Sequence, residues 1–383
     1  MEISLASSNH AKVARYATNA LFFMSGLSFS SWASRIPDVK EKLGLGDAAL
    51  GTVLFAMPIG SLSALPLAGV IINALGSRKV TFISAIIYLF SMPFLGISTQ
   101  AWQLAIALFV FGFGGDLLNI SMNVQAVNVE KTMQKSIMSS FHAIFSMGFM
   151  IGAALGGILA SQGVSTLGHL STVGVLDIVV ALITFKYLIA QDFKSSESQP
   201  LFALPDKALM LLGVICFCGM LCEGAMADWS VLYYKQILGT ATKYASSAFT
   251  AFSITMVIGR IIGDRTVAKL GLKKTLVLNC SLVTLGMLVA LAFPNAWTVI
   301  AGFSITGLGL STVVPLIYSE AGHSKTMSAG VALAAISTVG ISGFMIGPVM
   351  IGYIAEFTSL KIALCSLIIL GGLGTILSTR IKN

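Results

Sequence analysis

The stretch Gly-Phe-Met-Ile-Gly at residues 148–152 occurs a second time at residues 343–347, 195 residues further along the chain. Other pairs keep this spacing: Trp102 and Trp297, Gly76 and Gly271, Gly157 and Gly352. Several matches at one spacing indicate two structurally equivalent halves rather than a chance similarity. We therefore predict an internal repeat.

The composition indicates that these halves lie in a membrane. Hydrophobic residues make up 56% of the chain and charged residues only 10%, whereas about a quarter of the residues in an ordinary globular domain are charged. Runs of about 20 apolar residues can cross a bilayer as helices. We predict an all-α membrane protein with twelve transmembrane helices, centred near residues 22, 60, 88, 115, 148, 180, 220, 254, 283, 308, 341 and 369.

Residues 191–207 interrupt the apolar pattern near the middle of the chain. They are rich in serine, proline and charged residues, which is typical of a linker. We predict an N-terminal six-helix half at 1–190, a cytoplasmic linker at 191–207 and a C-terminal six-helix half at 208–383. An even number of spans in each half makes the two halves parallel.

Lysine and arginine are distributed unevenly between the two sides of the predicted membrane. The N-terminus and alternate loops carry sixteen of them, and the opposite loops carry six. Because cytoplasmic loops are enriched in these residues, we predict that both termini are cytoplasmic. The net charge of +8 then belongs to the inner loops, and we expect no nucleic-acid partner.

The sequence carries no motif for enzymatic chemistry. It has no phosphate-binding loop, no nucleophile elbow and no paired catalytic carboxylates. The five cysteines do not have the spacing of metal ligands. We therefore expect no enzymatic activity, no cofactor and no metal.

Two loops carry the resemblance to a known family. Residues 69–79 read Gly-Val-Ile-Ile-Asn-Ala-Leu-Gly-Ser-Arg-Lys, and residues 264–274 read Asp-Arg-Thr-Val-Ala-Lys-Leu-Gly-Leu-Lys-Lys. With twelve spans and two parallel halves, the chain resembles the major facilitator superfamily, whose signature loop is Gly-x-x-x-Asp-Arg-x-Gly-Arg-Arg. Asn73 replaces the acid of that loop, so the family's latch is not expected here. Arg260 and Asp264, four residues apart, can pair locally instead; the alternative is simple anchoring to lipid headgroups.

Three further motifs refine the resemblance. They are Trp-Ala-Ser-Arg-Ile-Pro-Asp at 32–38, Phe-His-x-x-x-Ser-x-Gly at 141–148 and Glu-Gly-Ala-Met-Ala-Asp-Trp at 223–229. Together they are similar to the bacterial YbjJ-type branch, which is related to the fucose-permease group of sugar–proton symporters. This resemblance implies a location in the bacterial inner membrane and a small polar solute.

The repeated pentapeptides place small residues on one helical face. Gly148 and Gly152 in one half, and Gly343 and Gly347 in the other, allow helix backbones to approach closely. They are similar to a Gly-x-x-x-Gly-Pro motif of facilitator proteins in which the corresponding helices meet across the interface between halves. We expect interface glycines here; the alternative is static close packing.

Polar side chains inside the predicted spans are candidates for a binding site. Asp116, Asn119 and Asn123 fall on one face of the fourth span. We expect the two amides to bind substrate and Asp116 to carry a proton. The family's proton-binding glutamate would stand at Asn119, so that known pair is not expected.

The seventh predicted span contains two acids. Glu223 and Asp228 are five residues apart, so their side chains point about 140° apart around the helix. We predict that Glu223, deeper in the apolar run, carries a proton at a central site, and that Asp228 pairs with Arg35 as a gate. The alternatives are a structural hydrogen bond for Glu223 and a helix-end charge for Asp228.

Three ring-bearing side chains complete the candidate site. Trp32 and Tyr318 can stack on a sugar or another planar ligand, and His142 can bind substrate or relay protons. Placement at the membrane interface is the alternative for Trp32, and a neutral interhelical hydrogen bond is the alternative for His142.

These residues lead to one functional prediction. We expect a monomeric secondary transporter that moves a small polar solute, such as a sugar or sugar-like metabolite, together with protons by rocking of two halves. Efflux of a metabolite or amphipathic compound is the first alternative. A non-transporting membrane receptor or assembly partner with the same fold is the second.

Overall fold

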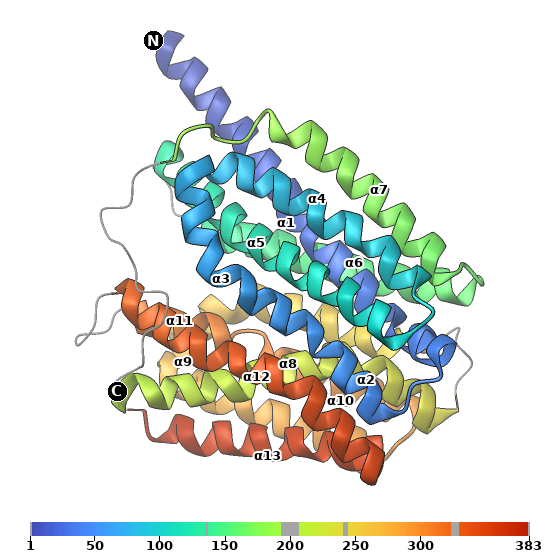
Figure 1. Ribbon diagram of the computed structural model, residues 1–383. Coiled ribbons are helices and arrows are strands. Elements are labelled where there is room, and N and C mark those ends of the chain that lie inside the picture. Colours follow the sequence, from blue (N-terminus) through green and yellow to red (C-terminus); the bar gives the residue numbers. More distant parts are fainter. Residues whose placement is uncertain (1, 135–136, 193–206, 240–243, 323–328, 382–383) are drawn as a thin grey trace. The chain divides into compact units, whose positions relative to one another are not determined.

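The computed structural model is almost entirely helical (Figure 1). It describes residues 2–134, 137–192, 207–239, 244–322 and 329–381. The helices up to the predicted linker are α1 (Glu2–Leu43), α2 (Asp47–Leu54), α3 (Ala56–Leu75), α4 (Ser77–Ile97), α5 (Ala101–Met133), α6 (Met138–Ser161) and α7 (Thr166–Phe185). Those that follow are α8 (Lys207–Leu238), α9 (Ser247–Ala292), α10 (Ala296–Leu310), α11 (Val313–Gly322), α12 (Ala329–Phe357) and α13 (Leu360–Thr379).

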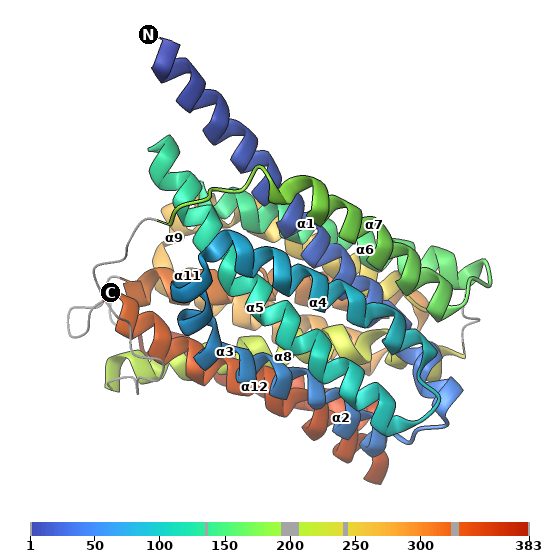
Figure 2. The ribbon, with the colours of Figure 1, turned by 45° about the horizontal axis from the view of Figure 1, so that its top comes forward.

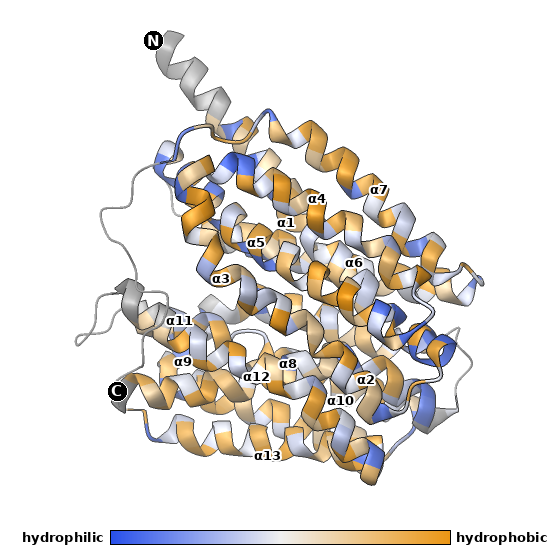
Figure 3. Cartoon of the chain, in the orientation of Figure 1, coloured by the Kyte–Doolittle hydropathy of each residue, from blue (hydrophilic) through white to orange (hydrophobic). Residues whose placement is uncertain are grey.

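Long apolar helices lie where the sequence predicts membrane spans. Among the described residues, ten helical stretches are long and apolar enough to cross a membrane, and they contain ten of the predicted centres. The centres near residues 22 and 254 fall in α1 and in the shorter apolar helix Ser247–Gly263. Hydrophobic residues run along most of α4 and α7 (Figure 3). The prediction of an all-α membrane protein is confirmed.

The chain divides into two compact units. The first consists of Met1–Leu43 and Ala56–Ser196, and the second of Gly44–Phe55 and Glu197–Asn383. The segment Gly44–Phe55, which contains α2, thus groups with the second unit, and the predicted six-helix halves stay a prediction. The predicted linker lies largely outside the described residues, since 193–206 are not described.

In the first unit, α1 packs against α6 and α7, and α4 packs against α5 and α7 (Figures 1 and 2). The glycines of α6 face α1: a Cβ on Gly148 would overlap the carbonyl oxygen of Phe23, and one on Gly152 would overlap that of Leu27. The glycine face is thus filled by a helix of the same unit. This contact corresponds to the close-packing alternative, and a role of these glycines between the halves stays a prediction.

In the second unit, small residues also allow close helix contacts. Gly343 of α12 leaves no room for a Cβ against the Phe217 carbonyl of α8, and Gly347 lies against Leu221 of the same helix. Further along α12, Gly352 meets the backbone of Gly51 in α2. A close approach of this kind explains why the short helix α2 groups with the second unit.

The repeated loops share one backbone conformation. Gly76 has φ 82° and ψ 148°, and Gly271 has φ 77° and ψ 165°. This combination is essentially restricted to glycine. The helix starts also keep the repeat spacing, because α5 begins at Ala101 and α10 at Ala296. The sequence repeat is therefore a repeat of local structure.

Replacing the loop glycines tests this conformation. We expect Gly76→Ala and Gly271→Ala each to lower the free energy of unfolding by about 1–3 kcal/mol, the usual cost of a strained backbone. An added Cβ at Gly271 would meet nothing within 4 Å, so the loss comes from the backbone and not from a clash. Thermal unfolding of the purified protein measures the effect.

Gly69→Ala in α3 is the matched control. A Cβ there also meets nothing within 4 Å, and the residue is helical. Alanine is the better helix former, so this variant should keep or raise the unfolding temperature. Equal losses in all three variants would contradict the interpretation.

Candidate functional site

A proline in the second unit frees one backbone carbonyl inside a predicted span. Pro315 has no N–H, so the carbonyl of Ser311, four residues earlier, loses its helical donor. The helix is interrupted here, since α10 ends at Leu310 and α11 begins at Val313. Arg260 of α9 donates from Nε to the Ser311 oxygen at 3.2 Å. The arginine thus replaces a missing backbone donor.

The same guanidinium contacts Glu223 of α8. Arg260 Nη2 lies 3.6 Å from Glu223 Oε1, and the two side chains are 24% and 30% exposed. Charges within a membrane are costly unless they are paired or hydrated, and each residue is the other's counter-charge. Both side chains remain partly exposed within this unit.

Small and polar residues support the pair. Asn279 of α9 donates from Nδ2 to Thr312 Oγ1 at 2.6 Å. Gly259 and Gly263 leave no room for a Cβ against Ser311 and Thr312. The glycines therefore bring α9 close to the α10–α11 junction. We call the group Glu223, Arg260, Asn279, Ser311 and Thr312 the α8–α9–α10 cluster.

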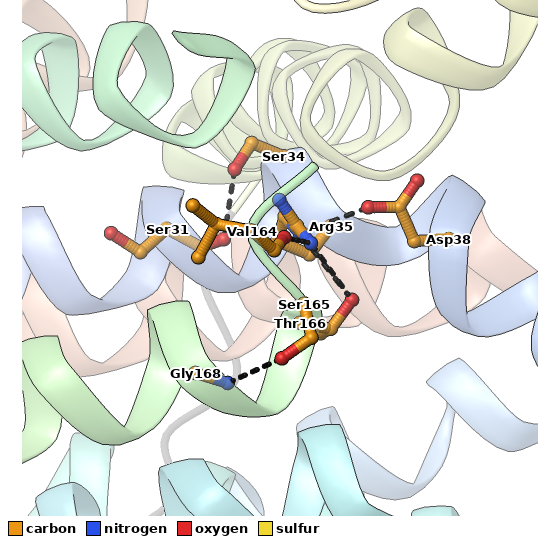
Figure 4. Close-up of polar contacts among 8 residues, drawn as sticks. All are labelled: Ser31, Ser34, Arg35, Asp38, Val164, Ser165, Thr166 and Gly168. Carbon is orange, nitrogen blue, oxygen red and sulfur yellow. Dashed lines mark hydrogen bonds and ion pairs between the residues drawn. The ribbon is translucent and has the colours of Figure 1, made fainter. Parts of the chain in front are cut away.

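In the first unit, Arg35 links the C-terminal part of α1 to the segment between α6 and α7 and to the start of α7 through hydrogen bonds (Figure 4). Its Nη2 donates to the Val164 carbonyl at 2.6 Å and to Thr166 Oγ1 at 3.2 Å. Its Nε lies 2.9 Å from Asp38 Oδ2. Arg35 is only 2% exposed, so it acts in this structure as a buried structural contact.

The described contacts do not test either of the two predicted gating pairs. Asp228 is buried, and its Oδ2 has no hydrogen-bond partner in the structure. Arg35 and Asp228 belong to different units, so their predicted pairing stays a prediction. The pairing of Arg260 with Asp264 also stays a prediction, because the Asp264 side chain lies outside what the structure describes.

The predicted polar face of the fourth span lies on α5. Asn123 Nδ2 donates to the backbone oxygen of Asn119 at 2.8 Å and to its Oδ1 at 3.0 Å. Asn119 is exposed, while Oδ2 of Asp116 is buried without a hydrogen-bond partner. An exposed amide on a membrane helix is typical of a hydrated surface. The substrate and proton roles of these residues stay predictions.

The three predicted ring-bearing residues have different environments. Trp32 is 1% exposed, and its Nε1 has no hydrogen-bond partner among the described residues. His142 is exposed, and its ring packs edge-on against Phe22 with centroids 5.4 Å apart. Tyr318 is half-buried in α11 of the second unit. The structure thus does not gather them at one point within a unit.

Sequence reasoning missed three members of the α8–α9–α10 cluster. Ser311, Thr312 and Asn279 are ordinary polar residues in apolar runs, with nothing in their neighbours that marks a site. One signal was available: Pro315 stands four residues after Ser311, and the carbonyl at that spacing always loses its helical donor. The sequence cannot tell which side chain replaces it.

Comparisons with known proteins agree with this architecture. The model of the Major Facilitator Superfamily matches residues 19–319 and 209–381. An uncharacterized MFS-type transporter of Yersinia pestis is 35% identical over 91% of this chain and 90% of its own length. Membrane protein MosC of Rhizobium meliloti is 32% identical over 91% of this chain and 86% of its own.

Two further similarities extend the comparison. The sialic acid transporter NanX of Escherichia coli (strain K12) is 24% identical over 85% of this chain and 83% of its own. The crystal structure of the nucleoside transporter NupG has a TM-score of 0.71 and 15% identity, covering 95% of this chain and 98% of that one. At this identity the second similarity concerns the fold alone.

Arg35→Lys tests the buried contact at the end of α1. Lysine keeps the charge but has one nitrogen in place of three, so it cannot keep Asp38, Val164 and Thr166 together. Hydrogen bonds to charged groups contribute about 1.5–3 kcal/mol each, and we expect a loss of this size in thermal unfolding. Arg265→Lys, at an exposed position, should leave stability unchanged. The interpretation is wrong if the two variants behave alike.

A double-mutant cycle tests the contact between Arg260 and Ser311. Arg260→Lys removes the Nε donor, while Pro315→Ala supplies an N–H that can bond the Ser311 carbonyl. We therefore expect Arg260→Lys to destabilise the protein less in the Pro315→Ala background, with a coupling of about 1 kcal/mol or more. Unfolding of the four proteins measures it. Strictly additive effects would show that the two residues do not share this carbonyl.

Proposed function

Because the chain belongs to the Major Facilitator Superfamily, we propose that it is a secondary active transporter moving a small polar solute together with protons. Its family and its apolar helices make it a multi-pass membrane transporter. The bacterial relatives support a location in the inner membrane. Alternating access by two six-helix halves is the mechanism that the internal repeat favours.

The observation that carries the proton proposal is the Glu223–Arg260–Ser311 arrangement. Glu223 is an acid within a span, it is partly exposed, and its counter-charge is 3.6 Å away. Protonation of Glu223 would remove one charge of this ion pair. Arg260 keeps its contact with the Ser311 carbonyl, and a solute oxygen that approaches Arg260 then meets a neutral acid in place of a competing carboxylate.

Protonation of Glu223 and binding of the solute to Arg260 are coupled in this arrangement. A solute oxygen on Arg260 competes with ionised Glu223, so binding is favoured when Glu223 is neutral. Loss of the proton restores the ion pair and expels the solute. The differential contacts required for coupling are thus provided by one arginine.

A sugar-like solute fits the donors and acceptors available. Arg260 presents N–H groups, and Asn119 and Asn123 of the first unit provide amides that both donate and accept. One relative is a sialic acid transporter, which supports an oxygen-rich, sugar-like solute. Trp32, His142 and Tyr318 are proposed as further substrate contacts.

Three further features are part of this proposal. We propose that Asp116 is a further proton carrier, that both termini are cytoplasmic and that the protein acts as a monomer. The oxygen of Asp116 without a hydrogen-bond partner supports the first of these. The excess of lysine and arginine on the N-terminal side supports the second.

Glu223→Gln tests the proposed coupling. Glutamine mimics the protonated acid, so we expect solute uptake driven by a pH gradient to be abolished. Solute binding should stay within about threefold of the unmodified protein, a change of less than about 1 kcal/mol. Uptake into proteoliposomes and equilibrium binding measure the two quantities.

Glu320→Gln is the matched control, because Glu320 is an exposed glutamate of α11 in the same unit. It should leave both uptake and binding unchanged. Undiminished gradient-driven uptake by Glu223→Gln would exclude Glu223 as the proton carrier. A thermal-shift screen against sugars, nucleosides, amino acids and drugs at two pH values would identify the solute class.

A further inference from the structure

A second acid lies inside the first unit, away from the α8–α9–α10 cluster. Asp177 falls near the middle of α7, and it is 4% exposed. Ser28 of α1 donates from Oγ to Asp177 Oδ2 at 2.7 Å. This bond joins two helices through a carboxyl group buried at the depth of a membrane span.

Asp177 has no basic partner among the described residues. Two arginines of the spanning helices pair with other acids, Arg35 with Asp38 and Arg260 with Glu223. The helices packed against α7 carry further titratable or charged side chains: Lys12, Arg15, Tyr16, Arg35, Asp38, Lys40, Glu41 and Lys42 of α1, Arg78, Lys79 and Tyr88 of α4, and His142 of α6, while His169 lies on α7 itself. The Tyr88 hydroxyl donates to the backbone oxygen of Ser25 at 3.2 Å, so it does not neutralise the acid.

An open groove reaches this carboxyl. The groove runs between α1, α6 and α7, has a volume of about 360 Å³, and is lined by Asn19, Phe23, Met24, Ile144, Asp177 and Val180. Most of its lining side chains are apolar, and Asn19 and Asp177 are the polar ones. The Oδ1 atom of Asn19 is buried in the same region without a hydrogen-bond partner, so a water there would satisfy it.

Burial and the lack of a basic partner favour the protonated form of Asp177 over the ionised form. An ionised aspartate at the centre of a membrane helix costs about 2.5–3.5 kcal/mol on insertion scales, and one Ser28 hydroxyl is a weak compensation. A proton on Asp177 removes this cost. When water enters the groove, the ionised form becomes accessible.

We propose that Asp177 is a proton-binding residue of the first half, distinct from Glu223, which exchanges its proton through the groove beside Asn19. The proposal deepens the proton coupling proposed above and rests on it for its role in transport. Because Ser28 belongs to α1, gain or loss of this proton acts directly on the contact between α1 and α7. A buried acid without access to water would keep its proton across the accessible pH range.

Infrared difference spectroscopy of the purified protein in lipid nanodiscs tests the proposal without any solute. A pH titration of the unmodified protein should show the C=O stretching band of a protonated carboxyl that disappears as the pH rises. Asp177→Asn should abolish one such band and bind one proton fewer per molecule. A spectrum that Asp177→Asn leaves unchanged at every pH overturns the proposal, and so does an Asp177 band that does not respond to pH.

Ser28→Ala covers the case in which Asp177→Asn fails to fold. It keeps the acid and removes only the hydrogen bond from α1, so the Asp177 band should move to higher frequency. If no carboxyl band changes frequency in Ser28→Ala, the assignment of the band to Asp177 is wrong.

Glu223→Gln separates this inference from the proposed function. If Asp177 titrates while Glu223→Gln retains gradient-driven uptake, the role of Glu223 fails and the Asp177 site stands. If Asp177 does not titrate while Glu223→Gln loses uptake, the inference about Asp177 fails alone.

Discussion

A backbone carbonyl freed inside a membrane must find another donor, because lipid chains offer none. In the second unit, Pro315 frees the Ser311 carbonyl and Arg260 supplies the donor. A charged donor in turn requires an acid within reach, and Glu223 meets that need. One missing N–H therefore determines how α8, α9 and the α10–α11 junction meet.

In the first unit, Arg35 also donates to a backbone carbonyl, but its surroundings differ from those of Arg260. It bonds a carboxylate, a backbone carbonyl and a hydroxyl at once, which the planar array of guanidinium donors allows. Arg35 is 2% exposed, whereas the Arg260 side chain is 24% exposed. The first arginine is therefore enclosed by its contacts, whereas the side chain of the second is partly exposed.

The glycines show how far a repeat can be interpreted from sequence. The equivalence of Gly76 and Gly271 follows from their spacing, and the structure gives both nearly the same backbone conformation. The neighbours of Gly148 and Gly343 do not follow in this way. Glycine has no side chain to specify a partner, so any helix can approach its face. In this structure α1 and α8 occupy those faces within their own units.

Asp177 is a residue whose functional candidacy the sequence alone does not reveal. Sequence reasoning treats a single acid in an apolar run as a helix-end charge or a packing residue, because its neighbours along the chain carry no pattern. The structure brings it to Ser28, 149 residues away, and to a groove formed by three helices. Burial and hydrogen bonding, rather than sequence spacing, make it a functional candidate.

The sequence by itself determined the membrane class, the positions of the spans, the repeat and the glycine turns, since each depends on local composition or on a fixed spacing. It also identified Glu223 and Arg260 as charges within spans. Only the tertiary structure decided that these two pair, that Arg260 holds Ser311 across 51 residues, and that α2 joins the second unit. The physical reason is that nearly every helix face here is apolar, so periodicity does not specify which helices meet. Helix packing makes that choice, and with it the partner of every buried charge.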